Sequence, residues 1–155
     1  GKPFARILTA DLFTKIENQK TYSVVRFILL DDLNRILFLK RFKLSKFDSN
    51  SWCLPGGKVK FGKSVESSGI EEVFEETGLS LFEVKFLFFL DRLPNEGGGT
   101  KSINFYFTAK HFGEVFLNEE SLKYAWVGRS ELNKYDIAFG NDVAVKKYFD
   151  EFKDS

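Results

Sequence analysis

Runs of apolar residues bounded by turn residues predict that much of this chain forms β-strands. Tyr22 to Leu30 is rich in valine, isoleucine, phenylalanine and leucine, as is typical of a buried strand. Arg35 to Phe42 has a similar pattern, and we expect it to complete a hairpin across the turn Asp31 to Asn34. A polar loop follows. Further strands are predicted at Trp52 to Gly57, Leu81 to Asp91, Ser102 to Ala109 and Lys123 to Val127.

Capping residues frame a helix between these strands. Ser64 is a good N-cap, Glu66 suits the first helical turn, and Gly78 suits the position after the last turn. Together they predict a helix from Val65 to Thr77.

The last part of the chain predicts a second main helix at Asn141 to Phe152. A short helical turn over Glu131 to Lys134, capped by Ser130, precedes it. Strands interleaved with two main helices predict an α/β sandwich around one sheet, in a single domain over residues 1–155.

The charge balance and the cysteine content exclude some classes of protein. The chain has 23 Lys and Arg against 22 Asp and Glu, and obligate binding to nucleic acid or an anionic membrane needs a basic excess. No apolar run reaches the roughly 18 residues of a transmembrane helix, and no signal-peptide pattern opens the chain. One cysteine cannot form an internal disulfide, so we expect a cytoplasmic protein.

Three carboxylates of the predicted helix lie on one face. With about 100° between successive residues, Glu72, Glu75 and Glu76 share an arc of about 100°. Their mutual repulsion and the helix dipole both make this arrangement unfavourable for stability alone. A hard cation such as Mg²⁺ would remove both costs, and a solvated acidic face is the alternative. The opposite side of the helix is expected to be buried and carries Ile70, Val73, Phe74 and Thr77.

The residues around this helix resemble the Nudix box. Leu54-Pro55-Gly56-Gly57 precedes the helix, and Glu75-Glu76-Thr77-Gly78-Leu79 ends it. The family's pattern is a glycine, five residues, a glutamate, seven residues, and then Arg-Glu-apolar-x-Glu-Glu-x-Gly-apolar. Over residues 57–79 the expected offsets are occupied by Gly57, Glu72, Val73, Glu75, Glu76, Gly78 and Leu79.

This resemblance implies a Nudix-type α/β/α sandwich with a mixed central sheet and a loop–helix–loop over the box. It also implies divalent-metal-dependent hydrolysis of a pyrophosphate bond. Glu72, Glu75 and Glu76 would be catalytic. With the backbone of Gly56, they would also hold Mg²⁺, with Mn²⁺ as the alternative ion.

Two positions depart from the family's pattern. The early glutamate is replaced by Lys63, and the arginine before Glu72 is replaced by Glu71. In the family, these positions carry opposite charges that brace the loop against the helix. Both signs are exchanged in this chain, so we expect Lys63 and Glu71 to form a swapped ion pair. The alternative is drift at both positions in a weak or inactive member.

A further carboxylate is expected outside the box. Members of the MutT-like branch commonly supply one from a loop, six residues ahead of a tryptophan. Counting back from Trp126 gives Glu120, with Glu119 beside it, and Glu96 in an earlier loop is another candidate. Such a residue could bind a second metal ion or accept the proton of the attacking water. Simple solvation of this loop is the alternative.

The same resemblance suggests substrate-binding residues. Arg41 matches a basic residue that points toward the nucleotide, although an exposed strand-end charge is the alternative. Lys58 could bind a phosphate or hold the loop. Asn141 matches an asparagine that reads a purine base, but we favour it as the N-cap of the last helix.

The substrate expected from this resemblance is a nucleoside triphosphate. Pro94, fifteen residues beyond Leu79, has a spacing associated with ADP-ribose pyrophosphatases, so ADP-ribose or a nucleotide sugar is the alternative. A non-catalytic module that senses nucleotides is the alternative of another class. Many relatives are dimers, so a homodimer is possible.

Overall fold

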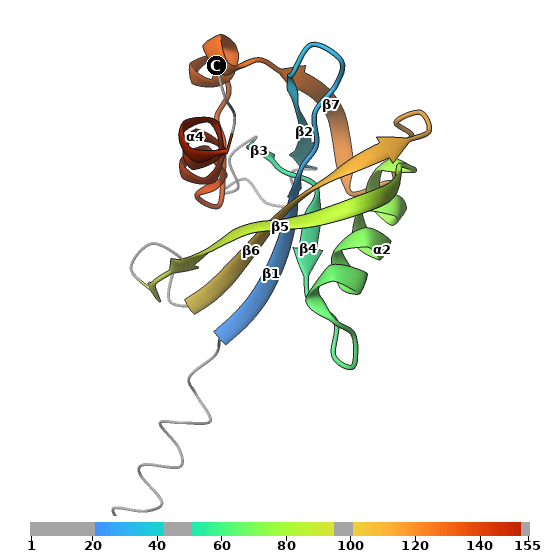
Figure 1. The fold of residues 1–155 in the computed structure, drawn as a ribbon, viewed down its shortest axis with the longest axis vertical. Helices are drawn as coiled ribbons and strands as arrows, with labels where there is room; N and C mark the ends of the chain where they lie inside the picture. Colours follow the sequence, from blue (N-terminus) through green and yellow to red (C-terminus); the bar gives the residue numbers. More distant parts are fainter. Residues whose placement is uncertain (1–20, 42–50, 95–100, 153–155) are drawn as a thin grey trace, which may run out of the picture.

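The computed structural model describes residues 21–41, 51–94 and 101–152. In this part of the chain, a four-stranded sheet contains β4 (Gly56–Lys58), β1 (Thr21–Ile28), β6 (Lys101–Phe112) and β5 (Ser80–Arg92), in that order. A three-stranded sheet contains β3 (Trp52–Cys53), β2 (Ile36–Arg41) and β7 (Ser121–Val127). β1 and β6 are parallel while β1–β4 and β5–β6 are antiparallel, so the four-stranded sheet is mixed (Figure 1).

Two helices, α2 (Val65–Thr77) and α4 (Asn141–Glu151), lie on opposite sides of the strands (Figure 1). The side chains of a strand alternate between its faces, and two cores result. The core under α4 contains residues from six elements, among them Ile28, Phe38, Phe88, Tyr106, Val145 and Phe149. The core under α2 contains Val73 of the helix and the alternate strand positions, among them Val25, Phe27, Leu37, Leu39 and Phe107. The predicted α/β class with a mixed sheet is therefore confirmed.

The predicted hairpin between the first two strands is limited to its turn. Asp31 accepts hydrogen bonds through its side chain from the Leu33 and Arg35 amides, at 3.0 and 2.8 Å, and this fixes the turn. Beyond the Leu30–Ile36 bridge, however, the two strands diverge into different sheets. The hairpin is therefore shorter than predicted. The Leu37 amide still donates to the Leu29 carbonyl at 3.1 Å, but β1 finds its longer partner in β6, with eight consecutive residue pairs from Thr21 to Ile28.

The caps of α2 are those expected. The Ser64 hydroxyl accepts from the Ser67 amide at 3.1 Å, and Gly78 has a φ of 74° while its amide donates to the Phe74 carbonyl. The short helical turn begins two residues earlier than predicted, because the 3₁₀ helix η1 (Arg129–Lys134) has Gly128 as its N-cap in place of Ser130. No helix in the described residues has the length and apolar composition needed to cross a membrane.

Candidate functional site

The glycine-rich loop ahead of α2 holds one of the predicted carboxylates. Gly56 has a φ of 139°, and a Cβ at this position would lie 2.0 Å from the Val25 carbonyl oxygen, so only glycine fits. This conformation directs the Gly56 amide at α2, where it donates to Glu76 Oε1 at 2.8 Å. This hydrogen bond joins the loop to the helix at Glu76, one of the predicted metal ligands.

The buried face of α2 is rotated about the helix axis relative to the face that the sequence predicts. Val73 and Thr77 are buried as expected, but the Phe74 side chain is 56% exposed. Gly69 explains the difference, because a Cβ there would lie 2.6 Å from the Phe27 ring, so the helix approaches β1 along its glycine side. Glu76, on the same side as Gly69, is consequently only 7% exposed.

Burial changes the acidity of two glutamates of this helix. Loss of hydration raises the pKa of Glu76 from an ordinary 4.5 to about 7, although the hydrogen bond from Gly56 opposes the rise. Burial also raises the pKa of Glu72, and the neighbouring carboxylate of Glu75 adds to the effect. The charge of Arg26 opposes the rise for Glu76 and the charge of Lys60 opposes it for Glu72, but neither cancels the effect of burial.

A cavity of about 770 Å³ opens beside these carboxylates. This volume lies within the range of about 300–1,000 Å³ that is usual for small-molecule sites. Its acidic residues come from α2 and from the loop before β7, and they are Glu72, Glu76, Glu119 and Glu120. Its basic residues come from β1, β2, β4 and β5, and they are Arg26, Arg41, Lys58 and Arg92.

The structure brings together most of the residues predicted for the site. Glu120 is close enough to Glu72 and Glu76 for its charge to raise the pKa of each. Glu119 also lines the cavity, so either loop glutamate can reach it, whereas Glu96 lies outside the described residues. Glu75 is not among the described residues that line the cavity.

Glu75 belongs instead to a cluster of charges on the exposed side of the helix. Lys63 donates a hydrogen bond to Glu71, which is the contact expected for the swapped pair. Lys60 Nζ lies 3.0 Å from Glu71, 3.5 Å from Glu75 and 4.0 Å from Glu72. Hydrogen bonds from both lysines lower the pKa of Glu71 to about 2. Our sequence reasoning missed Lys60, although a second lysine in a short loop facing an acidic helix was a usable signal.

Asn141 does not cap α4, so that prediction is wrong. The N-cap is Gly140, and Asn141 is the first residue of the helix. Its side chain is fully buried: Oδ1 accepts from the Leu54 amide at 2.9 Å, and Nδ2 lies 3.4 Å from both the Phe139 carbonyl and the Tyr106 hydroxyl. Asn141 is not among the described residues that line the cavity, and its predicted contact with substrate stays a prediction.

An aromatic residue that the sequence did not single out lies in the cavity beside two arginines. The Cζ atoms of Arg26 and Arg41 lie 5.3 and 5.2 Å from the centre of the Phe139 ring. Phe139 has a φ of 60°, which is rare for an aromatic residue and which no sequence pattern marks. Lys58 lies with its Nζ 4.1 Å from the centre of the Tyr22 ring. Three basic side chains of the cavity therefore lie against aromatic rings in cation–π contacts.

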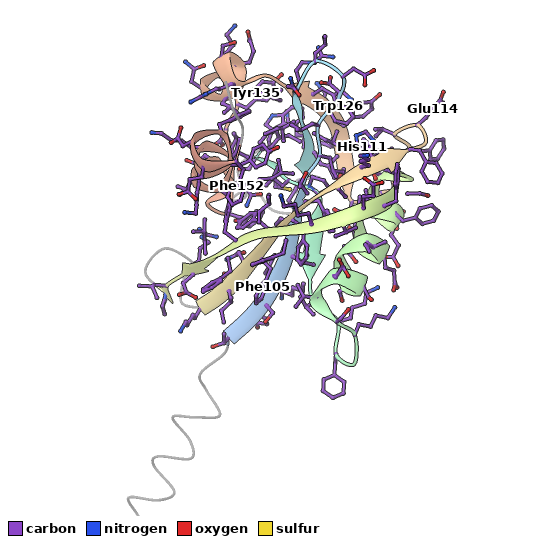
Figure 2. The ribbon with its side chains drawn as sticks, viewed as in Figure 1. Phe105, His111, Glu114, Trp126, Tyr135 and Phe152 are labelled. Carbon is purple, nitrogen blue, oxygen red and sulfur yellow. The ribbon has the colours of Figure 1, made fainter. Side chains whose placement is uncertain are left out.

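The lone histidine and the lone cysteine have structural surroundings. His111 stacks on Trp126 with ring centres 5.6 Å apart, and its Nε2 lies 2.8 Å from the Leu30 carbonyl (Figure 2). Cys53 is buried, and burial raises the pKa of its thiol. Within the described residues, neither belongs to a group of three or more side chains that could hold a metal ion.

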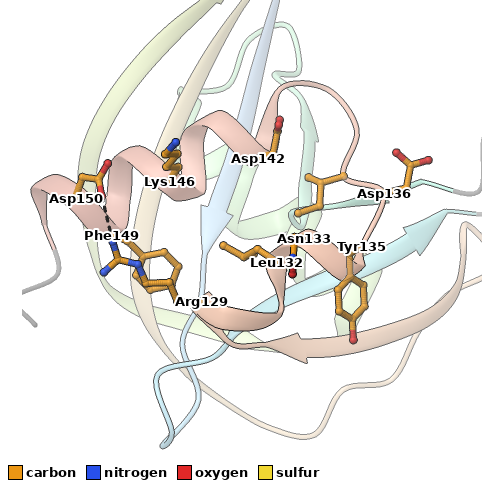
Figure 3. A pocket seen from close by; sticks show the side chains of 10 residues that line it. Arg129, Leu132, Asn133, Tyr135, Asp136, Asp142, Lys146, Phe149 and Asp150 are labelled. Atoms are coloured by element: carbon orange, nitrogen blue, oxygen red, sulfur yellow. Dashed lines mark hydrogen bonds and ion pairs between the residues drawn. The ribbon is translucent and has the colours of Figure 1, made fainter.

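A second cavity, of about 530 Å³, lies between η1 and α4 (Figure 3). Its charged residues have an acidic excess, and Arg129 is already paired with Asp150 at 3.2 Å. A polyphosphate would be repelled there, so this cavity does not compete with the first as a phosphate site. Its charged lining residues are Asp136, Asp142, Asp150, Arg129 and Lys146.

The donor set of the first cavity fits a divalent metal ion in its chemistry. Glu72, Glu76 and Glu120 offer oxygen atoms alone, which hard cations such as Mg²⁺ prefer. Burial and mutual repulsion raise the pKa of Glu72 and Glu76, and both effects would be reversed by a bound cation. Within the described residues, no three such side chains already stand close enough together to hold the ion, so some side-chain movement would be required.

Comparison with known proteins identifies the family. The NUDIX domain family model matches residues 20–148 of the chain. A stretch of 60 residues is 37% identical to an m7GpppN-mRNA hydrolase, NUDT17, of Xenopus laevis, and it covers 38% of this chain and 20% of that protein.

Solved structures extend the likeness to the fold. The MutT NUDIX hydrolase of Burkholderia pseudomallei has a TM-score of 0.70 at 22% identity, over 83% of this chain and 98% of its own. The MutT protein of Methanosarcina mazei Go1 has a TM-score of 0.72 at 21% identity, over 89% of this chain and 99% of its own.

Proposed function

This chain belongs to the Nudix family of pyrophosphate-hydrolysing enzymes, and we propose that it cleaves a pyrophosphate bond in a nucleoside triphosphate with the help of a divalent metal ion. The observation that carries this proposal is the joint presence of buried carboxylates and of basic residues in one cavity of about 770 Å³. Carboxylate oxygens are the ligands that a divalent cation prefers, and basic side chains bind phosphate oxygens, so this lining fits a complex of metal and polyphosphate. We also propose that residues 1–155 form a single domain.

Each predicted acidic residue has a role in this proposal. Glu72, Glu75 and Glu76, with the backbone of Gly56, would hold Mg²⁺ or Mn²⁺. The ion, when bound, supplies Lewis-acid stabilisation of the phosphate charge. Glu120 would accept the proton of the attacking water, since a carboxylate within reach of the site can act as a general base. Glu75 would have to turn from Lys60 toward the cavity.

The basic residues would bind the phosphates. Arg41 can offer two parallel hydrogen bonds to a phosphate, and Arg26 beside it can do the same. Lys58 can act as a point charge toward a third phosphate oxygen. The pair of Lys63 and Glu71 would brace the loop against α2. A role in bracing requires the opposite charges to stay in contact, whichever residue carries which sign.

The test is a substrate screen with Mg²⁺ and with Mn²⁺ in parallel. Nucleoside triphosphates, ADP-ribose, nucleotide sugars and a capped dinucleotide are compared, and the products are separated to show which bond is cut. Glu76→Gln is expected to abolish turnover, whereas Glu114→Gln, an exposed glutamate outside the cavity, is expected to leave it unchanged.

Three results separate the alternatives. Preferred hydrolysis of a triphosphate to the monophosphate and pyrophosphate supports the proposal. Preferred hydrolysis of ADP-ribose or a nucleotide sugar replaces the nucleoside triphosphate as the substrate, while metal-dependent pyrophosphate hydrolysis stays supported. Tight nucleotide binding in calorimetry without any turnover overturns hydrolysis in favour of a sensor module.

A further inference from the structure

Phe139 occupies a strained position at the edge of the cavity. Its φ of 60° is unfavourable for a residue with a side chain, so other contacts must hold it there. Its ring lies beside both Arg26 and Arg41, at 5.3 and 5.2 Å from their Cζ atoms. The ring therefore packs against two of the basic groups of the cavity.

The side chain of Asn141 contacts the backbone of Phe139. Its amide Nδ2 lies 3.4 Å from the Phe139 carbonyl oxygen and 3.4 Å from the Tyr106 hydroxyl. Its Oδ1 accepts from the Leu54 amide at 2.9 Å. A fully buried amide is kept only where its hydrogen bonds are satisfied, so these contacts fix the orientation of Asn141.

Leu54 connects this arrangement to the glycine-rich loop. Its carbonyl oxygen accepts from Arg26 Nη1 at 2.9 Å, while its amide donates to Asn141. Two residues later, the Gly56 amide donates to Glu76 Oε1. One peptide segment thus links the arginine side of the cavity to the carboxylate side.

We infer that Asn141 is a positioning residue that sets the spacing between the Phe139–arginine group and the glycine-rich loop. This inference rests on the proposed function, because the spacing matters where phosphates span a metal ion and two arginines. It differs from the base-reading role that the family resemblance implied, since Asn141 acts through Leu54 and Phe139. Displacements of about 1 Å in such a site reduce catalysis strongly.

The experiment compares Asn141→Ala, Phe139→Leu and the double variant in the full chain. The first removes the hydrogen bonds and the second keeps an apolar side chain but removes the ring. Asn133→Ala, an exposed asparagine in η1, is the matched control. Measured quantities are KM and kcat for four nucleoside triphosphates, binding of inorganic tripolyphosphate with Mg²⁺, and hydrogen exchange at the Leu54 and Gly56 amides.

If Asn141 positions the cavity, KM and the dissociation constant of tripolyphosphate rise by about five- to tenfold, equally for every base. Both single variants give this rise, and the double variant adds little to either, because the residues act in series. Amide exchange at Leu54 and at Gly56 accelerates in Asn141→Ala. A change confined to one base shows base reading and overturns the inference, as does lowered stability with unchanged tripolyphosphate affinity.

These readouts also separate the inference from the proposed function. Tripolyphosphate binding and amide exchange need no turnover. If the wild type hydrolyses no nucleotide but loses tripolyphosphate affinity on substitution of Asn141, the inference stands and hydrolysis fails. If the wild type hydrolyses a nucleoside triphosphate but neither tripolyphosphate affinity nor amide exchange changes on substitution of Asn141, hydrolysis stands and the inference fails. Should Asn141→Ala not fold, Phe139→Leu alone decides through the same affinity measurement.

Discussion

The buried carboxylate of Glu76 makes the stability of the metal-free protein depend on pH. Between about pH 4.5 and pH 7, the folded protein keeps a proton on Glu76 that the unfolded chain has released. This contribution to stability is complete below about pH 4.5 and is lost as the pH rises through about 7. A rise in pKa from 4.5 to about 7 corresponds to about 3 kcal/mol, at about 1.4 kcal/mol for each pH unit.

Glu76→Gln removes the charge and keeps an oxygen that can accept from the Gly56 amide. In EDTA at about pH 8, we expect this variant to be about 1–3 kcal/mol more stable than the wild type, and the gain to vanish by about pH 5. Urea unfolding at several pH values measures the difference. Glu75→Gln, whose side chain is 48% exposed, is the matched control and should show no such trend.

Added Mg²⁺ should reverse the order of stability. Metal binding stabilises only a protein that keeps its ligands, so the wild type gains stability and Glu76→Gln gains little. A difference between wild type and Glu76→Gln that stays constant from about pH 5 to pH 8 in EDTA would show that Glu76 carries no burial penalty. That result would refute the reasoning from burial to metal affinity.

The remaining predictions concern the loop and its charges. Lys63→Glu or Glu71→Arg alone should lower kcat/KM by placing like charges together, and the double reversal should restore it; harmless single changes would contradict the pairing. Lys60→Gln should strengthen Mg²⁺ binding by about two- to fivefold in calorimetry at low salt, because the ammonium competes for the helix carboxylates, and an unchanged affinity would exclude competition. Gly56→Ala should destabilise the protein by about 2–4 kcal/mol in urea unfolding, since its Cβ would overlap the Val25 carbonyl.

The features predicted correctly from the sequence are those that depend on neighbouring residues. Ser64 and Gly78 cap α2 through bonds that span three and four residues, so the bounds Val65–Thr77 followed from spacing alone. The turn at Asp31 is equally local. Of the three box glutamates expected on one face, Glu72 and Glu76 line the cavity and Glu75 does not, so spacing along the helix placed only two of them.

The features that the sequence did not predict depend on distant contacts. Phe74 is exposed and Glu76 is buried because Gly69 lets α2 approach the Phe27 ring of β1 closely. Asn141 fails as a cap because its amide bonds to Leu54, 87 residues earlier in the chain. Local sequence propensity cannot predict which face of α2 is buried or which group Asn141 bonds to, because Phe27 and Leu54 are brought near these residues only by the fold.

The exchanged charges of the box have unequal consequences for bracing and for metal binding. Attraction between two opposite charges does not change when their signs are exchanged, so Lys63 and Glu71 can brace the loop as well as the reverse arrangement. The metal site has no such symmetry, because it requires negative oxygens. Lys60, drawn to Glu71, also stands 3.5 Å from Glu75 and offers that carboxylate an internal cation. A divalent ion must therefore displace an ammonium before it gains Glu75, which makes metal affinity the property in which this chain should differ most from relatives with the ordinary signs.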